Sequence, residues 1–314
     1  MAKVAFLFPG QGAQYVGMGR DLAAQFPEAA QVFDVANSVL NFDLKRLCWE
    51  GPEAELKRTA NQQPAVLTTS VACLRLLTGA GLKPDVVAGL SLGEYTALVA
   101  AESLTLEEAV PLVHLRGTFM QEAVPLGVGG MAAILGLPTD LVEELCSRAG
   151  KETGLTVQGA NYNCPGQVVI SGHIPAVEKV MDLAKEAGGK AVRLSVTAPF
   201  HSRLLARAGE MLDGALSQVT LREPQIPVVA NVTADYVPGR EALHSLLVRQ
   251  VYSPVRWEES IRRMLADGVR TFVEVGPSRH LSGFVKKIDK TVKTLNVEDA
   301  HSLGKVLDSV GRVC

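Results

Sequence analysis

The sixteen residues VVAGLSLGEYTALVAA, at positions 86–101, largely determine how this chain is expected to fold. The apolar run at 86–88 is typical of a buried strand of a parallel sheet, and residues 94–101 are predicted to be helical. The pattern G-x-S-x-G lies between them, so Ser91 falls on a tight connection from strand to helix. This setting predicts an α/β fold in which Ser91 is a nucleophile at a strand–turn–helix elbow. The alternative is that Ser91 only caps the helix.

The same alternation of strand and helix extends outward from this stretch. An apolar strand at 4–8 precedes a glycine-rich loop, and helical patterns follow over much of 19–40, over 61–79 and over 105–123. Further strands are predicted near 227–230, 271–275 and 291–295. Strands that alternate with helices predict a mostly parallel sheet covered on both faces. We expect an α/β domain formed by residues 1–126 and 198–314.

The pattern changes at the sequence PLGVGG, residues 125–130. Strands are predicted at 131–135, 155–160, 167–171 and 191–195, helices at 139–149 and 175–187, and a turn at 161–166. This order, βαββαβ, is that of a ferredoxin-like unit. We therefore predict a small domain, residues 127–197, inserted into the large one.

Composition excludes several classes of protein. The 314 residues include 31 basic and 33 acidic side chains, a net charge of −2, and 47% are hydrophobic. A disordered chain, a collagen-like repeat and a highly basic nucleic-acid binder are excluded. The first apolar run ends at Pro9, too early for a signal peptide, and no segment approaches the roughly 18 apolar residues of a membrane span. We expect a cytoplasmic protein, a monomer, that binds neither membrane nor nucleic acid.

Metal and nucleotide sites are not predicted either. The five cysteines (Cys48, Cys73, Cys146, Cys164 and Cys314) are scattered without a C-x-x-C motif, and no H-E-x-x-H is present. We expect reduced, idle thiols and no metal. The loop after residue 8 lacks the third glycine of G-x-G-x-x-G, and the chain has no P-loop motif, so no nucleotide cofactor is expected.

A nucleophilic serine needs a base, and the histidines compete for that role. His201 follows a predicted strand at the start of a helix, where α/β enzymes carry catalytic groups. His280 also follows a strand and is the main competitor, whereas His114 and His173 lie in or against helical patterns. The carboxylate expected between serine and histidine in an α/β-hydrolase is not evident, so a neutral acceptor such as a main-chain carbonyl is the alternative orienting group.

Arg116 lies on an apolar stripe of its predicted helix. Its neighbours one turn away are Leu112, Val113, Phe119 and Met120, and none is acidic. The guanidinium therefore either extends to the surface or meets an external anion. The second alternative requires a substrate that carries a carboxylate.

Seven motifs occur in order along the chain: FPGQGAQ (8–14), GLSLGEY (89–95), RG (116–117), NYNCPGQ (161–167), FHS (200–202), QVYSPV (250–255) and EVGP (274–277). Together they resemble the malonyl-CoA:acyl carrier protein transacylases of bacterial fatty acid synthesis, over nearly the whole chain. The resemblance implies an α/β-hydrolase-like large domain with a ferredoxin-like small domain. It also implies malonyl-CoA and holo acyl carrier protein as substrates, with no cofactor.

The resemblance further assigns roles to individual residues. Ser91 would be the acylated nucleophile and His201 its base, with the main-chain N–H groups of Gln11 and Leu92 as the oxyanion hole. The main-chain carbonyl of Gln250 would orient His201, so the Gln250 side chain is expected to be dispensable. Arg116 would hold the malonyl carboxylate. The substrate pocket would be lined by Gln63, Met120, Asn161 and Phe200. One departure is Leu90, where the family often has histidine.

An acidic carrier protein requires positive charge where it docks. The candidates are Lys190, Lys286, Lys287, Arg207 and Arg249. Other functions compete with the leading one: a transacylase of a polyketide pathway, a serine hydrolase or thioesterase of the same fold, and a carrier-binding subunit without activity. A hydrolase would not need an arginine that faces a substrate carboxylate.

Overall fold

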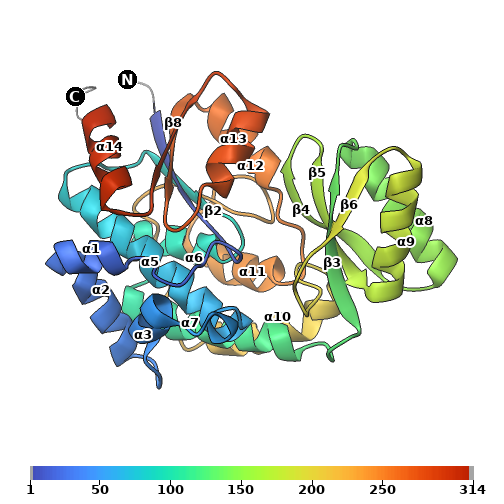
Figure 1. Cartoon of the computed structure of the whole chain (residues 1–314), viewed down its shortest axis with the longest axis horizontal. Helices are drawn as coiled ribbons and strands as arrows, with labels where there is room; N and C mark the ends of the chain where they lie inside the picture. Colours follow the sequence, from blue (N-terminus) through green and yellow to red (C-terminus); the bar gives the residue numbers. More distant parts are fainter. Residues whose placement is uncertain (1–2, 311–314) are drawn as a thin grey trace.

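A computed structural model describes residues 3–310, and its two sheets follow one another along its long axis, with helices beyond them at both ends (Figure 1). The five-stranded sheet is parallel throughout. Its strands in spatial order are β7 (Val228–Val229), β2 (Val86–Gly89), β1 (Lys3–Phe8), β8 (Val269–Val275) and β9 (Lys293–Val297). The second sheet is antiparallel, and its order is β4 (Val157–Cys164), β5 (Gln167–His173), β3 (Gly129–Leu135) and β6 (Lys190–Arg193). The predicted α/β architecture, with one parallel sheet and one separate sheet, is confirmed.

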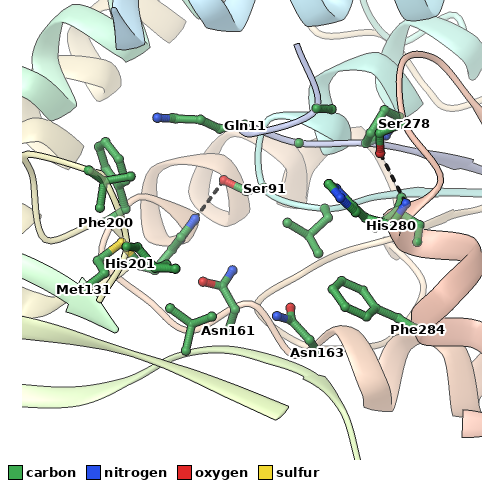
Figure 2. Close-up of a pocket in the computed structure, with 18 of the residues that line it drawn as sticks. Gln11, Ser91, Met131, Asn161, Asn163, Phe200, His201, Ser278, His280 and Phe284 are labelled. Carbon is green, nitrogen blue, oxygen red and sulfur yellow. Dashed lines mark hydrogen bonds between the residues drawn. The ribbon is translucent and has the colours of Figure 1, made fainter. Parts of the chain in front are cut away.

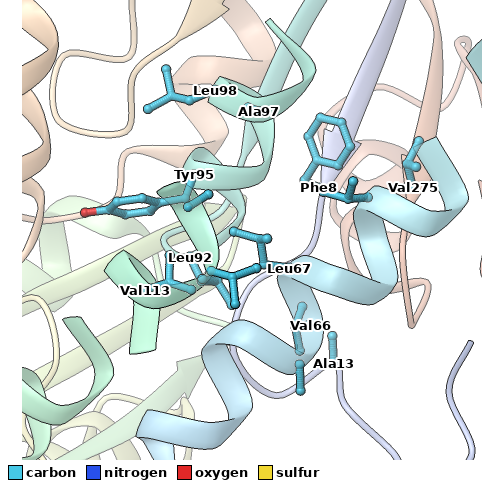
Figure 3. Packing of buried hydrophobic residues seen from close by; sticks show 14 of the residues in the cluster. Phe8, Ala13, Val66, Leu67, Leu92, Tyr95, Ala97, Leu98, Val113 and Val275 are labelled. Carbon is cyan, nitrogen blue, oxygen red and sulfur yellow. The ribbon is translucent and has the colours of Figure 1, made fainter. Parts of the chain in front are cut away.

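Both faces of the parallel sheet are buried, as the continuous apolar strands predict. On β1, Phe6 and Phe8 belong to one hydrophobic cluster, and Ala5 and Leu7 belong to another on the opposite face. Figure 3 shows part of the first cluster, which includes Phe8, Leu67 and Leu92. The helices that accompany this sheet are α1 (Arg20–Gln25), α2 (Pro27–Ser38), α3 (Leu44–Glu50), α4 (Glu53–Leu56), α5 (Thr59–Gly79), α6 (Gly93–Ala100), α7 (Leu106–Glu122), η1 (Arg203–Leu205), α10 (Ala206–Leu216), α11 (Arg240–Gln250), α12 (Trp257–Ala266), α13 (His280–Ile288) and α14 (Ala300–Val310).

The antiparallel sheet has its own core. Helices α8 (Thr139–Thr153) and α9 (Ile174–Glu186) cover it, and their residues Leu145 and Val180 share a hydrophobic cluster with Ile134 of β3. The elements follow the predicted order, strand–helix–strand–strand–helix–strand.

The predicted turn at 161–166 is wrong over most of its length. Strand β4 continues to Cys164, with irregular register beside β5. The main chain beyond β4 explains this extension: Tyr162 donates to the Val255 oxygen over 2.9 Å, and Val255 donates to the Ala160 oxygen over 2.8 Å. These bonds also tie the smaller sheet to the segment that follows α11. The chain reverses instead at residues 165–166.

The structure also describes the cysteines, the length of the helices and the possible metal ligands. Cys48, Cys73, Cys146 and Cys164 are buried free thiols, whereas Cys314 lies outside the described residues. Between residues 3 and 310 there is no helix long and apolar enough to span a membrane. In the same range, no group of three histidine, cysteine or acidic side chains could hold a metal ion.

Candidate active site

Ser91 occupies a strained turn between β2 and α6. Its φ is 54°, in the left-handed region that L-residues rarely adopt. The flanking glycines make the turn possible, because a Cβ on Gly89 would lie 1.9 Å from the Gly93 oxygen. A Cβ on Gly93 would lie 2.1 Å from the Phe8 oxygen. Leu92, not Ser91, is the N-cap residue of α6, so the capping alternative for Ser91 is wrong.

Ser91 and His201 lie within hydrogen-bond distance although they are far apart in the chain. The Ser91 Oγ is 2.7 Å from His201 Nε2 (Figure 2). On the other side of the ring, His201 Nδ1 is 2.9 Å from the main-chain oxygen of Gln250. A carbonyl can only accept, so Nδ1 carries the proton and Nε2 is left to accept from Ser91. Burial, together with the charge of Arg116, lowers the pKa of His201 to about 4. The imidazole is therefore neutral near pH 7 and has the tautomer that a general base requires.

The competing histidines make other contacts. His114 Nδ1 is 2.9 Å from the Ala60 oxygen, and His173 Nδ1 accepts from the Thr156 N–H. His280 lines the same cavity as Ser91, but its ring makes no hydrogen bond to Ser91. Of the four candidates, His201 is the one that contacts the nucleophile.

Arg116 is buried beside Ser91, with 1% of its surface exposed. Its Nη1 donates to Gln63 Oε1 over 2.8 Å, and its Nη2 donates to Gln250 Oε1 over 2.8 Å and to Ser91 Oγ over 3.2 Å. Gly117 allows α7 to approach α5 this closely, because a Cβ there would lie 2.6 Å from the Thr59 oxygen. The alternative in which Arg116 extends to the surface is wrong.

The guanidinium has only neutral hydrogen-bond partners among the described residues. Burial lowers the pKa of Arg116, and the nearby Glu94 carboxylate opposes this effect. A buried cation without a directly paired carboxylate is costly, and an incoming carboxylate would relieve that cost. The position can therefore recognise an acidic group that is delivered to Ser91.

A cavity of about 210 Å³ opens onto Ser91. Figure 2 shows Gln11, Ser91, Asn161, Phe200 and His201 around it. Met120 also lines it, whereas Gln63 does not: it is fully buried and contacts Arg116 and the Met120 sulfur. The expectation that Gln63 lines the pocket is wrong, because α5 places it behind the arginine.

Three polar groups of this site carry roles that the sequence did not indicate. The Asn231 Oδ1 accepts from the Ser91 N–H over 2.7 Å, and its Nδ2 donates to the Gly89 oxygen. The Glu94 Oε2 accepts from the Asn231 N–H and from Gln250 Nε2. The Gln250 side chain, expected to be dispensable, is fully buried and joins Arg116 to Glu94. These contacts span up to 156 residues of sequence, so no local pattern indicates them.

Comparison with known proteins agrees with this geometry. The family model described as the acyl transferase domain matches residues 5–311. The chain belongs to the acyl transferase family. It is 47% identical over 304 residues to the malonyl CoA-acyl carrier protein transacylase of Bacillus subtilis, covering 96% of each chain.

Solved structures of acyltransferases are also similar. The malonyl CoA-acyl carrier protein transacylase of Clostridium perfringens has a TM-score of 0.96 at 44% identity, covering 99% of this chain and 98% of that one. A malonyl-transacylase in complex with a type II PKS acyl-carrier protein has a TM-score of 0.95 at 42% identity, covering 98% of this chain and 100% of that one.

In the described part of the chain, two main-chain N–H groups near Ser91 lack an acceptor: that of Gln11, which lines the cavity, and that of Leu92, which follows Ser91 but is not a lining residue. Within residues 3–310, the N–H groups of Gln11 and Leu92 donate to no other group, whereas the Ser91 N–H is occupied by Asn231. Leu90 also lines the cavity and presents an apolar side chain beside the elbow.

The basic residues considered for docking differ in their surroundings. Lys286 donates to the main-chain oxygen of Val292, and Lys287 donates to Gln167 Oε1 over 3.3 Å. Lys190, Arg207 and Arg249 are exposed and form no ion pair with another described residue of the acyltransferase. None of the five lines the cavity at Ser91.

Proposed function

We propose that this acyltransferase moves the malonyl group from malonyl-CoA to the phosphopantetheine thiol of an acyl carrier protein, through a malonyl ester of Ser91. The observation that carries the proposal is the buried Arg116 guanidinium, whose Nη2 lies 3.2 Å from the nucleophilic oxygen. A hydrolase of unspecific acyl groups has no use for a cation there. The names of the relatives from Bacillus subtilis and Clostridium perfringens support the same substrates.

In the first half-reaction, His201 Nε2 takes the Ser91 hydroxyl proton while Oγ attacks the thioester carbonyl carbon. The negative charge that develops on the carbonyl oxygen is met by the N–H groups of Gln11 and Leu92. The C–S bond then breaks, and the CoA sulfur leaves with the proton from His201. In the second half-reaction the carrier thiol gives its proton to His201 and attacks the ester, and Ser91 regains its proton as Oγ leaves. No metal or redox cofactor is required.

Recognition of the malonyl group rests on the guanidinium that contacts Ser91. Arg116 would pair with the free carboxylate through its planar fork, which suits a carboxylate better than a single ammonium does. The acyl chain would lie among Met120, Asn161 and Phe200, which line the cavity. Gln63 would act behind the substrate, by holding Arg116.

We also propose the finer description of the fold: an α/β-hydrolase-like large domain, residues 1–126 and 198–314, and a ferredoxin-like small domain, residues 127–197. The strand order β4-β5-β3-β6 supports the second assignment, because both βαβ units of the small domain are split. Strand β5 lies between β3 and β4, and strand β3 lies between β5 and β6.

The carrier protein would deliver its arm along a second hollow of about 1050 Å³, which shares Gln11, Leu194, Val196 and His280 with the cavity at Ser91. Lys190, Arg207 and Arg249 are the preferred docking candidates, since Lys286 and Lys287 already have partners.

The test uses purified protein, malonyl-CoA and a holo acyl carrier protein. The intact mass should rise by one malonyl group on Ser91, and the carrier should then become malonylated faster than free malonate appears. Hydrolysis without transfer would contradict the proposal. A polyketide carrier is a second candidate acceptor, favoured by the similarity to the type II PKS complex. Comparing carriers of the two pathways as acceptors decides between them.

A further inference from the structure

Glu94 is a buried carboxylate that the proposed reaction does not use. It lies in the first turn of α6, three residues after Ser91, and only 2% of its surface is exposed. Its Oε2 accepts from Gln250 Nε2 over 2.8 Å and from the Asn231 N–H over 3.0 Å. A buried carboxylate is costly unless it is hydrogen-bonded, so its retention beside the nucleophile requires an explanation.

The Gln250 carboxamide can have only one orientation between its neighbours. Arg116 has donors alone, so the amide oxygen must face it. The Ser91 main-chain oxygen and the Glu94 carboxylate accept, so the two amide protons must face them, over 2.9 and 2.8 Å. Rotation of the amide by 180° would place its NH₂ group against the guanidinium. Glu94 therefore helps to fix which end of Gln250 meets Arg116.

The consequence extends to the reacting atoms. With its oxygen fixed, Gln250 accepts from the same Nη2 that donates to Ser91 Oγ, while Gln63 holds Nη1. The amide also lies between the guanidinium and the Glu94 carboxyl group, with its oxygen toward the first and its N–H toward the second. We propose that Glu94 is a positioning residue for donor selection, which acts through Gln250 to hold the Arg116 guanidinium beside Ser91. This inference rests on the proposed function of Arg116.

Two conservative variants of Glu94 distinguish its role as a hydrogen-bond acceptor from the role of its charge. In Glu94→Gln the carbonyl oxygen can still accept from both donors, but the negative charge is gone. In Glu94→Asp the charge remains, but the side chain is one methylene shorter and withdraws from Gln250. The readout is the ratio of kcat/KM for malonyl-CoA to that for acetyl-CoA in acylation of Ser91. Because acetyl has no carboxylate, damage to the fold in general would lower both values and leave the ratio in place.

We expect the ratio to stay within about twofold of the parent in Glu94→Gln and to fall about tenfold in Glu94→Asp, the scale of a lost hydrogen bond in a charged network. The matched control is Glu274, the other buried glutamate among the described residues, which accepts from the Leu281 and Ser282 N–H groups of α13 instead. Glu274→Gln and Glu274→Asp should leave the ratio unchanged.

An unchanged ratio in Glu94→Asp, or a tenfold loss in Glu94→Gln, overturns the inference. If Glu94→Asp does not fold, Gln250→Met replaces it: this variant removes the bridging amide at similar volume, and an unchanged ratio there overturns the inference equally. If the proposed function is wrong, the parent protein itself forms no malonyl-Ser91, and the inference about Glu94 falls with it. If only the inference is wrong, the parent still forms malonyl-Ser91.

Discussion

The main-chain oxygen of Gln250 lies 2.9 Å from Nδ1 of His201, where a serine–histidine–aspartate triad would have a carboxylate. A neutral carbonyl fixes the tautomer and the ring orientation as an aspartate does. It offers less stabilisation to the imidazolium, however, and the nearby Arg116 charge disfavours that form further. His201 is therefore both correctly oriented and unprotonated near neutral pH.

The first prediction concerns the Ser91–His201 pair. Ser91→Ala should form no acyl-enzyme, because among residues 3–310 no other hydroxyl is bonded to the His201 ring. His201→Ala should slow acylation by about 10²–10⁴-fold, the usual contribution of a general base. Intact mass after a short incubation with malonyl-CoA measures both. A malonyl adduct of normal yield on Ser91→Ala would disprove the mechanism.

The pH dependence of acylation follows from the lowered pKa of His201. A protonated imidazole cannot accept the Ser91 proton, so activity is lost only where His201 becomes charged. With the pKa lowered from 6.5 to about 4, kcat/KM for the free enzyme should show its acid limb near pH 4–5 instead of near 6.5. Replacing Arg116 by alanine removes one cause of the shift, so the limb measured with acetyl-CoA should move to higher pH. A limb at 6.5 in the parent would contradict this account.

The Gln250 side chain provides the third prediction. Gln250→Ala keeps the carbonyl that orients His201 but removes the amide that holds Arg116. We expect acetyl transfer to change little and malonyl kcat/KM to fall at least about tenfold, since a hydrogen bond to a charged group is lost. The exposed Gln218 offers a control, Gln218→Ala. Equal retention of both donors in Gln250→Ala would show that the side chain is dispensable, as the sequence alone suggested.

The fold was predictable where local signals are strong. Apolar runs indicated β1, β2 and β8, and the two glycines around Ser91 indicated the turn, because only glycine fits beside the Phe8 and Gly93 backbones. The extension of β4 was not predictable, because its turn-forming residues pair with a segment about ninety positions away.

Only part of the site was predictable from the sequence. Ser91 and the arginine on an apolar helix face could be found from spacing alone. Glu94 lies within the quoted stretch at 86–101, yet its partners Asn231 and Gln250 are 137 and 156 residues distant. A buried network of this kind is set by tertiary contacts, so one sequence without its fold does not reveal it.

The last prediction tests the arginine that separates this site from a general serine acyltransferase. Arg116 is held at Nη1 by Gln63 and at Nη2 by Gln250, and it reaches Ser91 Oγ over 3.2 Å. A malonyl ester of Ser91 would bring its carboxylate to a guanidinium that is already oriented and desolvated. Removing one partner of such a pair costs about 3–5 kcal/mol, so Arg116→Ala should lose malonyl transfer by about 10²–10⁴-fold. Acetyl-CoA has no carboxylate to lose, and its relative activity should rise. Arg116→Lys should restore malonyl transfer only in part, since an ammonium cannot reproduce the bidentate fork. The measurement is kcat/KM for both donors in the parent, the two variants and a control at the exposed Arg75. If the ratio between donors is the same in all four proteins, Arg116 only supports the structure, and the malonyl carboxylate must bind elsewhere.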